Sequence, residues 1–99
     1  MYLEIDDEAI AEASEARDYY AAVGPELGRE FAAMLDQAIA RVLAKPLTWP
    51  LYTRRTRRYL MHRFPYAVIY RVKGDVLRVL AVSHQHRRPG YWAARLRRP

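Results

Sequence analysis

The chain from Tyr66 to Ser83 reads YAVIYRVKGDVLRVLAVS. Tyr66–Val72 has the pattern of one strand, and Val76–Ser83 has the pattern of the next. A Gly-Asp pair between two such runs, at Gly74-Asp75, predicts a tight hairpin turn. The second run is apolar on nearly both faces, as is typical of a strand in the centre of a sheet. The sequence therefore predicts a β-hairpin whose second strand lies inside the sheet.

The segments on either side of this hairpin extend the sheet. Tyr2–Ile5 alternates between polar and apolar residues and predicts a short first strand. Arg57–Arg63 also alternates, which predicts a strand with two different faces. One face would carry Arg58, Leu60 and His62, and the other Tyr59, Met61 and Arg63.

Two helices are predicted between these strands. The first runs from about Asp7 to Val23, since Ala9, Ala13, Ala16 and Tyr20 recur on one stripe. Gly24-Pro25 ends it, and the proline suits the first turn of the next helix. The second helix ends before Pro46 and Pro50, and its apolar stripe comprises Leu27, Phe31, Leu35, Ala38 and Val42.

Together these elements predict an α+β fold. An N-terminal two-helix hairpin would pack on a twisted antiparallel sheet of three to four strands. A short helix around Tyr91–Leu96 is expected to close the chain. A chain of 99 residues has the length of one domain, so we expect a single domain over residues 1–99. With no cysteine, no export signal and no long apolar run, the sequence predicts a cytoplasmic protein that does not enter a membrane.

Charge is distributed unevenly along the chain. Residues 1–36 hold ten acidic side chains and two arginines, a net charge of −8, whereas residues 37–99 hold fifteen cations and one acid, a net charge of +14. Most of these cations are arginines, which bind phosphate and carboxylate groups in a planar, bidentate geometry. We therefore expect an anionic partner on the cationic side of the fold.

A cluster of polar and aromatic residues, HQHRRPGYW, follows the hairpin at residues 84–92. Its residues could handle a phosphodiester: His84 and His86 as acid and base, Arg87 and Arg88 on the phosphate, and Tyr91 as a stacking ring or proton donor. Strand geometry alone also points two such histidines the same way, and either one could hydrogen-bond a carbonyl. A zinc site would need a third ligand, and nearby carboxylates are few, so neither metal nor cofactor is predicted.

The chain resembles the RelE/ParE superfamily of toxins along nearly its whole length. The histidine cluster and the Phe64-Pro65-Tyr66 block are the most discriminating parts of this resemblance. The residues that carry it are Tyr19-Tyr20, Leu27 to Phe31, Lys45-Pro46, Arg57-Arg58, Arg63 to Tyr66, Ile69 to Val72, Ala81-Val82 and His84 to Trp92.

The resemblance implies the toxin of a bacterial type II toxin–antitoxin module, held inactive by a cognate antitoxin. Some members cleave mRNA on the ribosome, and members nearer the ParE branch inhibit DNA gyrase. Cleaving members usually place lysines or a glutamate around the second strand, whereas Tyr52–Arg58 has arginines and threonines. Arginine stabilises charge but is a poor general base.

We therefore favour the ParE-like branch and growth arrest through gyrase or another topoisomerase, without catalysis. The first alternative is a metal-independent mRNA endonuclease, ribosome-dependent or free, whose catalytic residues would be His84, His86, Arg87 and Tyr91. The second is a degenerate toxin that retains only antitoxin binding and autoregulation. In each case the residues expected to bind the antitoxin or another anion are Arg54, Arg55, Arg57, Arg58, Arg63, Arg87 and Arg88.

The remaining aromatic residues are interpreted as packing. Trp49, between Pro46 and Pro50, is expected to cover the edge of the core, and Trp92 to anchor the C-terminal tail. The tail itself, Arg95–Arg98, could be an interaction element or a solvated end. The residues expected in the core are Tyr19, Tyr20, Phe31, Tyr66 and Tyr70.

Overall fold

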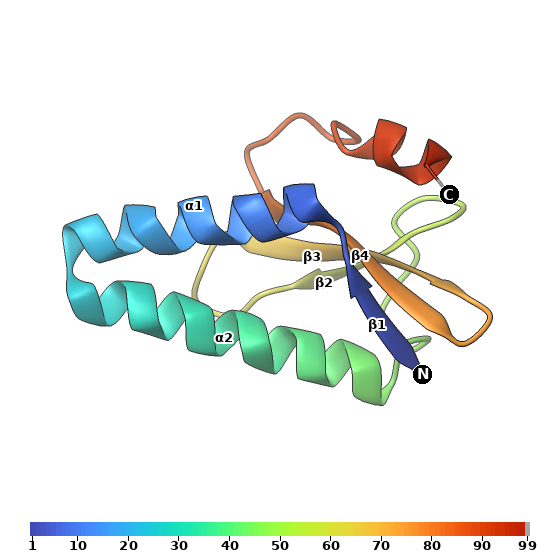
Figure 1. Ribbon diagram of the computed structural model, residues 1–99, viewed down its shortest axis with the longest axis horizontal. Coiled ribbons are helices and arrows are strands. Elements are labelled where there is room, and N and C mark those ends of the chain that lie inside the picture. The colour runs from blue at the N-terminus through green and yellow to red at the C-terminus, as the bar shows by residue number, and fades with distance from the viewer. Residues whose placement is uncertain (99) are drawn as a thin grey trace.

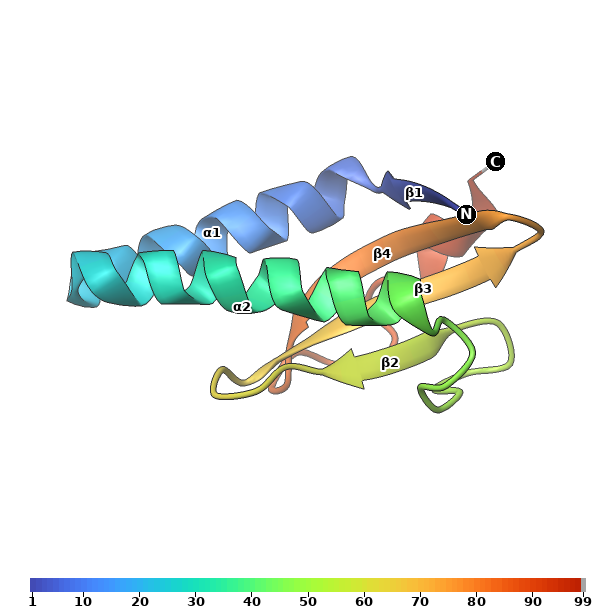
Figure 2. The same ribbon diagram turned by 90° about the horizontal axis from the view of Figure 1, so that it is seen from below.

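The computed structural model describes residues 1–98. Two helices lie side by side along one face of a four-stranded sheet (Figure 1). Figure 2 shows both helices on the same side of the sheet. The chain therefore has the expected α+β architecture. Its elements are β1 (Tyr2–Ile5), α1 (Asp7–Val23), α2 (Pro25–Ala44), β2 (Arg57–Leu60), β3 (Tyr66–Lys73), β4 (Val76–His84) and a 3₁₀ helix (Ala93–Arg97).

The helical hairpin follows the predicted pattern closely. Helix α1 has the predicted bounds, and Asp7 and Glu8 lie in its first turn, where the helix dipole favours negative charge. At the crossing of the two helices, a Cβ atom on Gly28 would lie only 2.7 Å from the Cβ of Ala21. The absence of a side chain at Gly28 therefore lets the helices approach closely. Helix α2 buries Phe31, Leu35, Ala38 and Val42 of the predicted stripe.

The sheet has the order β1-β4-β3-β2, so β4 is an inner strand as predicted. Strands β3 and β4 form the expected hairpin, with Gly74 at a φ of 61° in the turn. Strand β1 lies parallel to β4, with Tyr2 opposite Val76, so the sheet is mixed and not wholly antiparallel. Residue periodicity specifies a strand but not the direction of its distant partner, which the intervening helices determine here.

Strand β2 ends at Leu60, earlier than the predicted end at Arg63. The chain turns here: the Met61 N–H donates to the Tyr66 carbonyl at 2.9 Å, and Arg63 adopts a φ of 72°. A residue in this left-handed region cannot continue a strand. Tyr59 and Met61 are buried as the predicted alternation requires, but His62 and Arg63 belong to an exposed turn.

The aromatic predictions are confirmed with one exception. Tyr70 is fully buried, and its hydroxyl donates to the Pro46 carbonyl at 2.6 Å. Trp49 packs edge-on against Tyr59, with ring centroids 4.7 Å apart, and so covers the edge of the core. Tyr19 is 65% exposed, so its assignment to the core is wrong. Among the aromatic rings of residues 1–98, the Tyr19 ring contacts only the edge of Tyr20.

A second, smaller apolar cluster lies on the sheet face opposite the helices, which we call the far face. It contains Ala67, Ile69 and Ala81 from the sheet and Trp92 from the chain that follows β4. Trp92 is only 2% exposed, which confirms its role as the anchor of the tail. The predicted C-terminal helix is present as the 3₁₀ helix Ala93–Arg97.

Candidate functional site

The far face carries a hollow of about 300 Å³ beside Trp92. Its base is formed by β2 and β3, where Arg58 lies opposite Ile69 and Leu60 opposite Ala67. Cross-strand partners point to the same face of a sheet, so these four side chains gather on the far face. We call this the far-face hollow; the chain around it contributes Tyr52, Ser83, Gln85, Arg87, Arg88, Pro89 and Trp92.

Three arginines line the far-face hollow, and aromatic rings support two of them. The guanidinium carbon of Arg58 lies 4.2 Å from the centre of the Tyr52 ring, and that of Arg87 lies 3.9 Å from the centre of the Tyr91 ring. Such stacking orders a guanidinium without using its hydrogen-bond donors. Among residues 1–98, no carboxylate pairs with Arg58, Arg87 or Arg88. Their donors therefore remain available to an external anion.

Glu12 of α1 holds the chain that follows β4, residues 85–98, which we call the C-terminal segment. Its carboxylate accepts a 2.6 Å hydrogen bond from the Tyr91 hydroxyl and bonds of 3.0 and 3.1 Å from the Arg95 guanidinium. It also accepts the Val82 N–H at 3.1 Å. Glu12 was not among the site residues predicted from the sequence. The signal was present, since Glu12 falls between Ala9 and Ala16 on the apolar stripe, where an acid needs a partner.

A second buried pair secures the end of the C-terminal segment. Arg78 of β4 binds both carboxylate oxygens of Asp6, at 2.8 and 2.9 Å, and donates to the carbonyls of Arg95 and Arg98. Arg98 also forms a 2.6 Å ion pair with Glu8. The tail is therefore neither free for interaction nor simply solvated, because Arg95 and Arg98 pair with the acidic N-terminal half.

The four residues proposed for RNA cleavage do not all line either of the two hollows near them. Tyr91 directs its hydroxyl to Glu12, and burial, with this hydrogen bond, raises the pKa of Tyr91 to about 12. The Nδ1 atom of His84 accepts the His86 N–H at 3.0 Å. The His84 ring meets the edge of Tyr66 in a separate hollow that Glu15 and Tyr19 also line. The histidine rings lie 5.1 Å apart, and only Arg87 borders both hollows.

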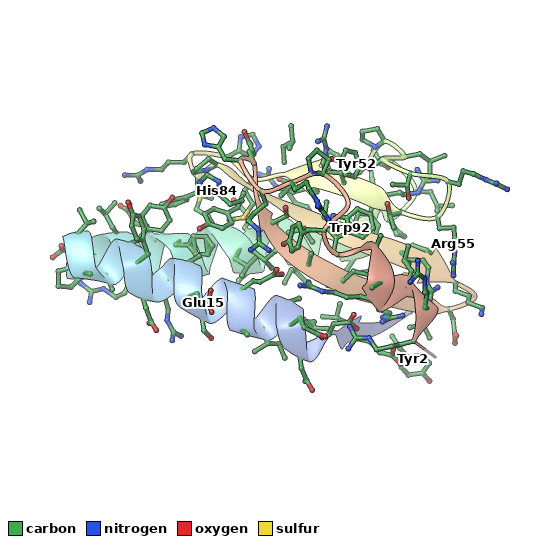
Figure 3. All side chains as sticks on the ribbon, turned by 90° about the horizontal axis from the view of Figure 1, so that it is seen from above. Tyr2, Glu15, Tyr52, Arg55, His84 and Trp92 are labelled. Carbon is green, nitrogen blue, oxygen red and sulfur yellow. The ribbon has the colours of Figure 1, made fainter. Side chains whose placement is uncertain are left out.

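The seven arginines predicted to bind an anion occupy different surfaces. Arg58, Arg87 and Arg88 line the far-face hollow, whereas Arg63 is drawn to α2 by a 2.9 Å ion pair with Glu30. Arg57 donates to the carbonyls of Leu47 and Trp49 at 3.2 and 2.7 Å. Arg54 and Arg55 line another hollow with Arg57. Figure 3 shows Arg55 and His84 at opposite ends of the sheet, with Tyr52 and Trp92 between them.

Raising the pH from about 10 to about 12 is expected to destabilise the fold. Burial raises the pKa of Tyr70 from its ordinary value of about 10 to about 12, and Tyr91 shows the same shift. Unfolded tyrosines lose their protons first, so the unfolded state binds fewer protons above pH ~10 and stability falls. For the fully buried Tyr70 the loss is on the order of 2 kcal/mol.

Urea denaturation at about pH 9 and about pH 12 measures this effect. Tyr70→Phe and Tyr91→Phe should each reduce the fall in stability between the two pH values. If both variants lose as much stability as the parent protein, the two hydroxyls are not the cause.

Within residues 1–98, no group of three or more His, Asp or Glu side chains is placed to hold a metal ion. In the same part of the chain, the helices are too short or too polar to traverse a lipid bilayer.

Comparison with known proteins identifies the family. The sequence model of the ParE toxin of the type II toxin–antitoxin system parDE matches residues 3–89. The fold is similar to a solved structure described as the chromosomal ParDE TA system from P. aeruginosa, with a TM-score of 0.76 and 20% identity over 85% of this chain and 95% of that one. A search of curated protein sequences finds no match. The chain belongs to the family of ParE toxins of type II toxin–antitoxin systems.

Proposed function

We propose that this ParE-family toxin arrests growth in the cytoplasm by binding DNA gyrase or a related topoisomerase complex, without catalysing a reaction. A cognate antitoxin neutralises it. The observation that carries this proposal is the far-face hollow, where Arg58, Arg87 and Arg88 lack carboxylate partners among residues 1–98. Membership of the ParE family favours a topoisomerase as the target.

The state of the titratable groups supports binding over cleavage. Metal-free RNA cleavage needs a base for the 2′-hydroxyl and an acid for the departing oxygen. Tyr91 holds its proton in a hydrogen bond to Glu12, and His84 uses Nδ1 to accept the His86 N–H. Arginine cannot serve as the base. The far-face hollow is thus richer in fixed positive charge than in groups that move protons.

Charge also supports an acidic antitoxin segment over the far-face hollow. Four of the N-terminal acids are already paired with arginines of the cationic half of the chain, in the pairs Asp6–Arg78, Glu8–Arg98, Glu12–Arg95 and Glu30–Arg63. The arginines of the far-face hollow have no such partner among the described residues. An acidic segment of the antitoxin would supply the missing carboxylates and cover the surface that binds the target.

One observation favours the mRNA endonuclease as a second candidate. The rings of His84 and His86 lie 5.1 Å apart, and Arg87 follows directly in the chain. Two imidazoles beside a guanidinium could share acid and base roles if a substrate rearranged this turn. The nuclease predicts cleaved transcripts, which the gyrase proposal does not.

Replacing Arg58 and Arg88 together by alanine is expected to abolish growth arrest on induced expression. Each side chain is expected to donate to an anionic group of the target, and losing both contacts would cost about 3 kcal/mol, or roughly a hundredfold in affinity. Arg29→Ala is the matched control, because Arg29 is exposed on α2, away from the far face. Colony counts after induction, with circular dichroism to confirm folding, measure the effect.

Transcript mapping in the same cells separates the candidates. Under our proposal, mRNA 5′ ends remain unchanged during arrest, and the double variant His84→Ala/His86→Ala remains toxic. New 5′ ends within minutes, absent in the histidine variant, would establish the endonuclease and contradict our proposal. No arrest by the folded parent protein would point to a degenerate toxin.

A further inference from the structure

A second cationic surface lies at the end of the sheet away from His84, beside Arg55 (Figure 3). It surrounds a hollow of about 380 Å³ between the 47–57 connection and the end of β3. We call it the Arg71 cluster. Its charged members are Arg54, Arg55, Arg57, Arg71 and Lys73, and its apolar members include Leu47 and Leu51.

Arg71 is electrostatically unsatisfied in the folded protein. Its Nε atom is buried and has no hydrogen-bond partner among residues 1–98. Burial lowers the pKa of the Arg71 guanidinium, and the positive charges of Arg78 and Arg55 lower it further, by more than the carboxylates of Asp6 and Glu4 raise it. A buried donor without a partner is destabilising. An anion bound to the Arg71 guanidinium would offset part of this cost.

The rest of the Arg71 cluster does not neutralise this charge. Of the charged side chains of the cluster, only Arg57 donates hydrogen bonds to other groups among residues 1–98, and its acceptors are backbone carbonyls, which leave its charge in place. Within the part of the chain that the structure describes, no carboxylate pairs with Arg54, Arg55, Arg71 or Lys73. Arg78 of β4, the cross-strand partner of Arg71, donates hydrogen bonds to both carboxylate oxygens of Asp6. The two neighbouring arginines thus differ in whether the fold supplies an anion.

We propose that the Arg71 cluster binds an acidic segment of a protein partner, with one of its carboxylates on Arg71. The apolar rim favours a peptide over a nucleic acid, because Leu47 and Leu51 are 65% and 62% exposed and no aromatic ring for base stacking lines the hollow. In such a partner segment, carboxylates would pair with the cations of the cluster, and leucine-like side chains would pack on Leu47 and Leu51. This inference extends our proposal of an acidic antitoxin, which would then have a second attachment site beyond the far-face hollow.

A stability measurement tests whether the unpartnered guanidinium of Arg71 destabilises the free protein. Arg71→Met keeps the apolar stem but removes the buried unpaired donor and its repulsion from Arg55. We expect the melting temperature of the free protein to rise by roughly 4 °C. Arg78→Met is the matched comparison and should lower the melting temperature, since it leaves Asp6 unpaired. An unchanged or lower melting temperature for Arg71→Met would contradict the inference.

A binding measurement tests whether the Arg71 cluster binds an acidic peptide. The probe is a short fluorescent peptide that alternates glutamate and leucine, and fluorescence anisotropy reports its binding to the full chain. We expect binding that weakens at least about tenfold in Arg71→Met, remains unchanged in Arg29→Met, and is lost when glutamine replaces glutamate in the peptide. Equal binding by Arg71→Met would overturn the inference. So would binding of an oligothymidylate of equal charge with no binding of the peptide, because phosphodiesters would then be the ligand.

These outcomes are independent of the growth-arrest experiment. If the peptide fails to bind while the parent protein still arrests growth, only the assignment of the Arg71 cluster as a binding site for an acidic segment is wrong. If the peptide binds through Arg71 but the parent protein leaves growth and gyrase unaffected, only the proposed toxin mechanism is wrong.

Discussion

Glu12→Ala is expected to destabilise the protein by about 4 kcal/mol and to abolish growth arrest, although Glu12 lies outside the far-face hollow. Its carboxylate accepts hydrogen bonds from Arg95, Tyr91 and the Val82 N–H. Glu12 and Arg95 are only 14% and 15% exposed, so the substitution leaves a largely buried cation without its partner. Tyr91, freed from Glu12, no longer fixes the position of Arg87.

Urea denaturation followed by circular dichroism measures the loss, and Glu15→Ala is the matched control. Glu15 lies on the same helix but is exposed, so its removal should change stability by less than about 0.5 kcal/mol. The double variant Glu12→Gln/Arg95→Met should recover part of the loss, because it removes the buried cation as well as its partner. Glu12→Ala and Glu15→Ala with equal stability would show that Glu12 does not anchor the C-terminal segment.

Trp92→Ala is expected to lower stability by a similar amount, about 3–5 kcal/mol. Trp92 is the largest side chain of the far-face cluster, is 2% exposed and lies 6.2 Å from the Tyr52 ring. Its removal leaves a cavity under the C-terminal segment and removes one wall of the far-face hollow. Binding of an anionic partner should therefore fall together with stability.

Trp92→Phe separates the two effects. A phenyl ring keeps part of the apolar contact with Ala67 and Ile69, so we expect an intermediate loss of stability and a folded protein at growth temperature. Growth arrest should then be weakened but retained. A Trp92→Ala protein that unfolds at the same urea concentration as the parent would contradict the assignment of Trp92 as the anchor of the segment.

Local patterns were enough to predict the helices and the hairpin. Helix α1 ends at Gly24-Pro25, and the buried residues of α2 recur at the helical period, so both are encoded within a few turns of chain. The Gly74-Asp75 turn likewise needs only its neighbours. The end of β2 was misplaced, because the alternation runs on to Arg63 while the backbone turns at Met61.

The partners of the arginines could not be predicted in the same way. Charge along the sequence predicted a cationic sheet face. The ion pairs Arg78–Asp6 and Arg95–Glu12, however, form only in the folded protein, where β1, α1 and β4 lie together. Long-range pairing also divides the remaining arginines between the far-face hollow and the Arg71 cluster. The sequence contained two usable signals, since an arginine within an apolar strand, such as Arg78, and an acid on an apolar helix stripe, such as Glu12, each require a buried partner.

Whether the toxin blocks a topoisomerase by binding through the far-face hollow, and cleaves nothing, can be measured in a supercoiling assay. Purified, folded toxin is titrated into DNA gyrase, with total RNA present in a parallel reaction. We expect that supercoiling stops as the toxin approaches saturation, that Arg58→Ala/Arg88→Ala is inactive and Arg29→Ala fully active, and that the RNA stays intact. Unimpaired supercoiling at saturating toxin, with cleavage of the RNA, would show that the toxin is a nuclease and does not act on gyrase.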